Sequence, residues 1–142
     1  MHIFFAGALN DLPNPKKTKS FYKKMALVAE KLGHMYFWAF LNGTDPDENP
    51  DVPARDVYTR DIAALDKCDI MIAYVGEPST GTGIEMEHAH QTKKPIVLLY
   101  EQGKRISRML LGSPAITKEL IFSSEEDALK QLETYLLTCK TA

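Results

Sequence analysis

Two carboxylates and a glycine-rich turn are the residues of this chain whose types and spacing suit a chemical reaction. Glu85 ends the segment Pro78-Ser-Thr-Gly-Thr-Gly-Ile-Glu85, and Asp61 precedes it on an amphipathic stretch. Paired carboxylates suit glycoside chemistry, because one can attack the sugar as a nucleophile while the other handles protons. Gly81 and Gly83 let backbone N–H groups approach a ligand, and the helix expected to follow directs its positive end to the same place. The pattern predicts a site for an anion or a polar sugar.

Each acid also has a simpler explanation. A glutamate in the first turn of a helix, where we expect Glu85, complements the helix dipole or caps the helix start. Asp61 fits a solvated charge on the polar face of an amphipathic helix. Their shared position near predicted strand ends, beside the glycine turn, favours a functional role. From the residues alone, an enzyme and a domain without catalysis both remain open.

Strand-like and helix-like segments alternate along the chain. Short apolar runs predict strands at residues 2–6, 35–40, 70–75, 95–100 and 119–122. Helical spacing of apolar residues or position between strands predicts helices at residues 18–32, 55–68, 84–92, 106–111 and 125–138. This order predicts an α/β fold, a doubly wound five-stranded parallel sheet of Rossmann-like or flavodoxin-like type. Ligands of such sheets bind beyond the carboxyl ends of the strands, which selects the loops after residues 6, 40, 75 and 100.

Length and composition limit the class of protein to which this chain can belong. The 142 residues, 44% hydrophobic and 25% charged, predict a single folded domain over residues 1–142. A net charge of −2 provides no basic field for nucleic acid or an anionic membrane. The apolar runs are far shorter than the roughly 20 residues that cross a bilayer, and the N-terminus lacks a signal-peptide pattern, so we expect a cytoplasmic protein. Cys68 and Cys139 have no metal-ligand spacing, and we expect neither a metal ion nor another cofactor.

The run from Asp61 to Glu85 resembles the central motif of the nucleoside 2-deoxyribosyltransferase superfamily, and is most similar to its hydrolytic branch, the 2'-deoxynucleoside 5'-phosphate N-hydrolases. The resemblance includes the spacing of the aspartate and the glutamate, the Pro-Ser-x-Gly-x-Gly-x-Glu turn, Lys94-Pro95, and Ile106-Ser-Arg-Met109. It spans roughly residues 55–110, with weaker agreement at Phe4-Phe-Ala-Gly7.

The resemblance implies roles for individual residues. Glu85 would be the nucleophile that forms a glycosyl-enzyme intermediate, and Asp61 would hydrogen-bond or protonate the departing base. Ser79 and Gly81 match positions that bind the 5'-phosphate in the hydrolases, whereas the transferases usually carry an aspartate at the Ser79 position. Ser107 matches a serine that reaches the phosphate from a neighbouring subunit, which implies a homodimer or higher homo-oligomer with shared sites. The expected substrate-binding residues are Phe4, Gly7, Asn10, Ser79, Gly81, Gly83, Ser107 and Met109.

The first loop departs from the family pattern. Phe4 stands where the family commonly has a tyrosine that steadies the catalytic carboxylate, so another group must do this, and Tyr74 and Tyr58 are the candidates. Ala8 and Asn10 replace a serine and an arginine of the hydrolases, which removes a charge-assisted phosphate contact. Only a fold that brings Lys16, Lys17 or Arg105 near the site would compensate for that loss.

The expected function is cleavage of the base–sugar bond of a 2'-deoxynucleoside 5'-monophosphate. One alternative is a nucleoside 2-deoxyribosyltransferase that moves deoxyribose between bases, and another is a nucleotide-binding or sensory module without turnover. A response-regulator receiver is disfavoured, because Gly7-Ala8 and Val75-Gly76 stand where its acidic residues are needed. Phosphoribohydrolases that activate cytokinin-type nucleotides have a different glycine signature and longer chains, and remain a minor alternative.

Overall fold

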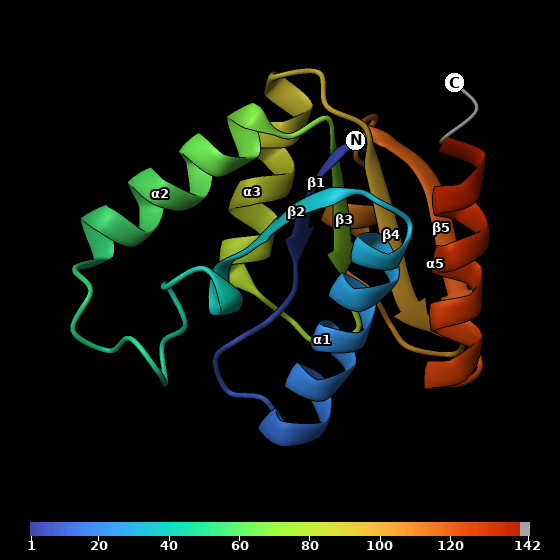
Figure 1. Cartoon of the computed structure of the whole chain (residues 1–142), viewed down its shortest axis with the longest axis horizontal. Coiled ribbons are helices and arrows are strands. Elements are labelled where there is room, and N and C mark those ends of the chain that lie inside the picture. Colours follow the sequence, from blue (N-terminus) through green and yellow to red (C-terminus); the bar gives the residue numbers. More distant parts are fainter. Residues whose placement is uncertain (140–142) are drawn as a thin grey trace.

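The sheet consists of five parallel strands in the order β2-β1-β3-β4-β5 (Figure 1). The strands are β1 (His2–Ala6), β2 (Met35–Trp38), β3 (Ile70–Tyr74), β4 (Ile96–Glu101) and β5 (Ile116–Phe122). This computed structural model describes residues 1–139, and residues 140–142 of the predicted domain lie outside the described part. It confirms the α/β fold of flavodoxin-like type. The strand order reverses between β1 and β3, the place where such sheets bind ligands.

Helices cover both faces of the sheet. They are α1 (Pro15–Lys31), α2 (Ala54–Lys67), α3 (Thr80–Gln91), α4 (Arg108–Leu111) and α5 (Glu125–Cys139), with a 3-10 turn at Ala39–Leu41. Helices α1 and α5 pack together on one face, and α2 and α3 pack together on the other (Figure 1). Within residues 1–139, none of the helices combines the length and the apolar character needed to span a membrane.

The strands build two cores because alternate side chains point to opposite faces of the sheet. Phe5, Tyr74 and Phe122 join Tyr22 and Trp38 in an aromatic-rich core under α1 and α5. The core under α2 and α3 is richer in aliphatic side chains and contains Phe4, Leu65, Met71, Met86, Ile96 and Leu98. Burial on both faces explains why β3 and β4 read as continuous apolar runs in the sequence.

Helix α3 begins at Thr80, four residues before the predicted start at Ile84. The side chain of Ser79 caps it, accepting a hydrogen bond from the N–H of Thr82 at 3.1 Å. Gly81 and Gly83 therefore lie inside the first helical turn. The prediction that they belong to a loop before the helix was wrong. Glu85 is in the second turn, so it is neither the cap nor a first-turn complement to the helix dipole.

Candidate active site

A cavity of about 1020 Å³ opens at the carboxyl ends of β1, β2 and β3. Its walls come from the loop after β1, the end of β2, residues 44–54, α2 and the start of α3. The size suits a small-molecule ligand. Six of the residues singled out from the sequence line it together: Gly7, Asn10, Asp61, Ser79, Gly81 and Glu85.

Glu85 is the most perturbed carboxyl group of this cavity. Burial and, secondly, the nearby charge of Asp61 raise the pKa of Glu85 to about 8. Among residues 1–139, no side chain hydrogen-bonds or ion-pairs with its carboxylate. Gly81 separates Glu85 from the helix cap, because a Cβ atom placed on Gly81 would lie 3.9 Å from both Glu85 Oε1 and Ser79 Oγ. The carboxylate and the helix N-terminus therefore border the same space.

Asp61 faces the cavity from α2. Burial raises the pKa of Asp61, while a hydrogen bond from Thr44 and the charge of Arg60 act in the opposite direction. The Thr44 hydroxyl oxygen lies 3.2 Å from Asp61 Oδ1. The Asp61 charge contributes to the raised pKa of Glu85. With a pKa of about 8, Glu85 retains a proton at neutral pH, so the site holds a proton that a leaving group could take up.

Four of the expected substrate-binding residues lie away from this cavity. Phe4 is fully buried under α2 and α3, where its ring stacks on Phe37 at 5.5 Å, and the next residue, Phe5, lines the cavity instead. Gly83 faces α4, with Leu110 as the nearest side chain. Ser107 directly precedes α4, and Met109 lies within it. Both residues are exposed, Met109 to 87%. The side chains of Ser107 and Met109 therefore do not reach the cavity of their own chain.

Several cavity residues were not found from the sequence. Thr44, Glu77 and Trp38 line the cavity, and none of them was among the expected site residues. Glu77 forms an ion pair with Lys104 at 2.8 Å. The only local signal for Thr44 was a hydroxyl residue in a turn-forming stretch after a predicted strand, a pattern too common to mark a site.

The two tyrosines considered for steadying a carboxylate have other positions. The Tyr74 hydroxyl donates to Glu101 at 2.5 Å, and Tyr58 lines the cavity while remaining 59% exposed. Thr44 is the side chain that hydrogen-bonds to Asp61.

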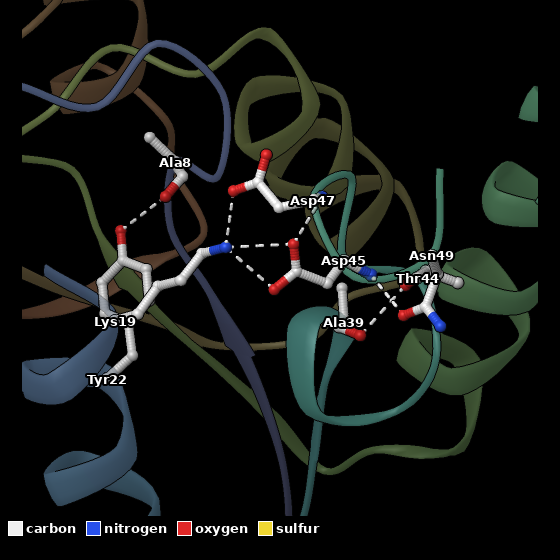
Figure 2. Close-up of polar contacts among 8 residues, drawn as sticks. All are labelled: Ala8, Lys19, Tyr22, Ala39, Thr44, Asp45, Asp47 and Asn49. Carbon is white, nitrogen blue, oxygen red and sulfur yellow. Dashed lines mark hydrogen bonds and ion pairs between the residues drawn. The ribbon is translucent and has the colours of Figure 1, made fainter. Parts of the chain in front are cut away.

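Gly7 has a packing requirement of its own. A Cβ atom there would lie 2.5 Å from the hydroxyl oxygen of Tyr22. That hydroxyl donates to the carbonyl of Ala8 at 2.9 Å, which fixes the loop after β1 (Figure 2). Only glycine leaves room for this contact.

All charged residues that line the cavity within residues 1–139 are acidic: Asp11, Asp61, Glu77 and Glu85. Lys16, Lys17 and Arg105, which the sequence offered as replacements for the missing arginine, are not among its lining residues. In the same described part of the chain, no group of three or more His, Cys, Asp and Glu side chains is arranged to hold a metal ion. An anion in this cavity would depend on backbone N–H groups at the start of α3.

Comparisons with known proteins identify similar sequences and similar folds. A relative from Methanosarcina mazei named "Putative 2'-deoxynucleoside 5'-phosphate N-hydrolase 1" is 36% identical over 78 residues, which cover 55% of this chain and 48% of the relative. The chain thus spans about half the length of that relative. A CMP N-glycosidase of Clostridium botulinum has the same fold, with a TM-score of 0.71 and 22% identity over 95% of this chain and 99% of that one. A 2-deoxyribosyltransferase of Bacillus psychrosaccharolyticus gives a TM-score of 0.66 and 22% identity over 93% and 96%.

The family model described as nucleoside 2-deoxyribosyltransferase matches residues 3–131, a range that contains the sheet, the cavity and both acids. The resemblance read from the Asp61–Glu85 run is thereby confirmed. This chain belongs to the nucleoside 2-deoxyribosyltransferase family, a family of N-glycosyl hydrolases and deoxyribosyltransferases.

Proposed function

We propose that this chain hydrolyses the base–sugar bond of 2'-deoxynucleoside 5'-monophosphates, with Glu85 as the nucleophile and Asp61 as the proton donor to the base. The observation that carries the proposal is the pair itself. Two half-buried carboxyl groups line one cavity beside the N-terminus of α3, and the raised pKa of Glu85 keeps a proton there at neutral pH. The names of the relatives support the substrate class.

In the first step, a Glu85 oxygen attacks the anomeric carbon of the sugar, and the bond between that carbon and the base nitrogen breaks. The electron pair of the broken bond goes to the base, which takes a proton from Asp61. Deoxyribose lacks the electron-withdrawing 2-hydroxyl group, so its cation-like transition state needs only a nearby negative charge. The product is a glycosyl ester on Glu85.

In the second step, water attacks the same carbon and gives a proton to Asp61. The ester bond breaks with its electron pair returning to Glu85, and deoxyribose 5-phosphate leaves. Both carboxyl groups regain their starting protonation, so the cycle needs no cofactor.

The pH dependence follows from the shared proton. The reaction requires one proton on the pair, whichever carboxyl group holds it in the free protein. Activity should therefore be bell-shaped in pH, with an alkaline limb near the pKa of Glu85 at about 8.

Deoxyribosyl transfer to a second base is the alternative, and one observation favours it. The charged lining residues Asp11, Asp61, Glu77 and Glu85 are all acidic, and Asn10 supplies no charge where the hydrolases have an arginine. The charged carboxylates among them would repel a phosphate dianion but not an unphosphorylated nucleoside, although Lys104 offsets the charge of Glu77. The first N–H groups of α3, next to Ser79 and Gly81, favour a substrate that carries a 5'-phosphate, because a helix N-terminus binds anions.

One panel assay separates these possibilities. Deoxynucleosides and ribonucleosides, with and without a 5'-phosphate, are incubated with and without a second free base, and products are resolved by chromatography. Free base with deoxyribose 5-phosphate supports the proposal, and a new nucleoside supports transfer. Binding of the panel without any base release would contradict both enzymatic readings and support a binding module.

We further propose that Ser107 and Met109 contribute to the site of a second copy of the chain. Both are exposed, and neither lines the cavity of its own chain. Mixing inactive Ser107→Ala with inactive Glu85→Gln should restore activity, because one site of the mixed dimer then has both native residues. Failure of the mixture to gain activity, with subunit exchange verified by mass spectrometry, would contradict shared sites.

A further inference from the structure

The connection between β2 and α2, residues 42–53, forms one wall of the cavity. Thr44, Pro46, Asn49, Pro50 and Val52 of this connection are lining residues. The connection contains neither an α-helix nor a β-strand, so a regular backbone ladder cannot hold it in place. The backbone N–H groups of Asn42 and Thr44 tie the start of the connection to the Ala39 carbonyl, at 3.0 and 3.1 Å, and side-chain contacts hold the residues that follow.

Lys19 of α1 makes the strongest of these contacts. Its Nζ atom lies 3.0 and 2.9 Å from the two carboxylate oxygens of Asp45 and 2.8 Å from Asp47 Oδ2 (Figure 2). The Lys19 side chain is 18% exposed and that of Asp45 only 3%, so this ion pair is poorly screened by water. It joins α1 to a segment 26 residues further along the chain.

Asp45 in turn hydrogen-bonds to the residues that follow it. Its Oδ1 atom accepts the N–H of Asp47 at 2.8 Å, and its carbonyl accepts the N–H of Asn49 at 2.8 Å. Its own N–H donates to the Asn49 side chain at 3.3 Å. The turn from Asp45 to Asn49, which follows Thr44 directly, is thus built around the carboxylate that Lys19 holds.

The Thr44 hydroxyl has two acceptors within reach, Asp61 Oδ1 and the Ala39 carbonyl, each at 3.2 Å. The Ala39 carbonyl already accepts the N–H groups of Asn42 at 3.0 Å and Thr44 at 3.1 Å. Since a carbonyl oxygen has two lone pairs, the single hydroxyl proton is best used by Asp61. Asp61 thereby receives a neutral donor from a segment outside its own helix.

We propose that Lys19 is a positioning residue, which holds residues 44–49 against α1 so that the Thr44 hydroxyl donates to Asp61. This inference rests on the role proposed for Asp61 in protonating the base. The charge that acts on Asp61 is that of Arg60 on the same helix, and the charge of Asp61 in turn acts on Glu85 of α3. Lys19 acts through the neutral Thr44 and adds no direct charge contact to Asp61.

The test compares Lys19→Met with Thr44→Val. We expect each to lower kcat about tenfold with little change in KM, because the acid is misplaced while the rest of the cavity is intact. Both should also move the acid limb of the pH profile to higher pH, since Asp61 loses a hydrogen bond that favours its charged form. The conservative Lys19→Arg and Thr44→Ser should restore the native limb.

Lys24→Met is the matched control. Lys24 lies on the same helix and forms an ion pair with Glu125 of α5, at 2.5 Å. Its loss should leave the pH profile unchanged. If Lys19→Met does not fold, Asp45→Asn removes the same ion pair while keeping the oxygen that accepts from Asp47.

A second readout does not depend on turnover. Carbon-13 NMR of labelled aspartate, with the Asp61 signal assigned by Asp61→Asn, follows the carboxyl titration directly. A rise in the Asp61 pKa in Lys19→Met and Thr44→Val supports the positioning role even if no substrate is cleaved. An unchanged Asp61 titration in Lys19→Met overturns the positioning role, whatever Thr44→Val shows and whatever the chain proves to catalyse.

Discussion

Asp61 and Glu85 on one side, and Asp45 with Asp47 on the other, form two acidic clusters beside the same cavity. Burial raises the pKa of Asp61, and that of Glu85 to about 8, whereas hydrogen bonds from Lys19 lower the pKa of Asp45 despite its burial. Asp45 is only 2% exposed and is the more buried of the two aspartates. Burial therefore does not separate Asp45 from Asp61, and a directly bonded lysine does.

The difference assigns the clusters to different tasks. A carboxyl group that keeps a proton near neutral pH can take part in proton transfer. A carboxylate fixed in an ion pair stays charged and serves to hold structure. The following predictions test that separation, beginning with the largest effect.

Glu85→Gln should reduce kcat at least about a thousandfold, because the nucleophile is lost while the cavity shape is kept. Steady-state base release measures the change. Glu87→Gln is the matched control on the same helix, since Glu87 is exposed and bonds to Gln91. Native turnover by Glu85→Gln would show that Glu85 is not the nucleophile.

Asp61→Asn should lower kcat about a hundredfold by removing the proton donor. It should also lower the pKa of Glu85, which will still exceed its ordinary value because burial is the larger cause of the shift. The pH profile should lose its alkaline limb and rise with the ionisation of Glu85. Asp66→Asn, on the same helix and bonded to His88, should keep the native profile.

Asp45→Asn should destabilise the fold at pH 7 by about 1–3 kcal/mol, because Lys19 loses a poorly exposed partner. A carboxyl group whose pKa is lowered by folding stabilises the fold at pH values above its pKa in the unfolded chain. That contribution is lost as pH falls through its pKa in the folded chain. The difference between the variant and the native chain should therefore shrink as pH falls below the ordinary pKa range of an aspartate. Urea unfolding at several pH values measures it, and an equal deficit at every pH would argue against the ion pair.

Glu85→Gln should have the opposite sign in the same experiment. A carboxyl group whose pKa is raised by folding contributes stability at pH values below its pKa in the unfolded chain. That contribution is lost as pH rises through its pKa in the folded chain, about 8 for Glu85. Removing the charge should therefore stabilise the chain at pH 9, by about 2–5 kcal/mol, and change little at pH 4. A variant less stable than the native chain at pH 9 would contradict this account.

Asp47→Asn should have the smallest effect, within about 0.5 kcal/mol, although its oxygen is as close to Lys19 as those of Asp45. The Asp47 side chain is 63% exposed, so water replaces most of what the ion pair provides. Thermal unfolding beside Asp45→Asn measures the contrast. Equal losses of stability in the two variants would mean that solvent exposure does not determine how much these ion pairs contribute.

Much of the fold was predictable because its signals are local. Continuous apolar runs marked β3 and β4, and apolar residues at helical spacing marked α1. Boundaries were less accurate where a single side chain decides them. Ser79 moves the start of α3 to Thr80, and Asn42 accepts the N–H of Trp38 at the end of β2, where the prediction extended the strand to Phe40.

The sequence by itself determined the order of the elements, the family, and the two acids on neighbouring segments, because periodicity and a motif of fixed spacing are written along the chain. Only the tertiary structure decided that Phe4 is buried away from the cavity, that Thr44 reaches Asp61, and that Lys19 holds Asp45. These contacts join residues that are distant in sequence. Their geometry depends on how the helices pack against the sheet, which no local pattern specifies.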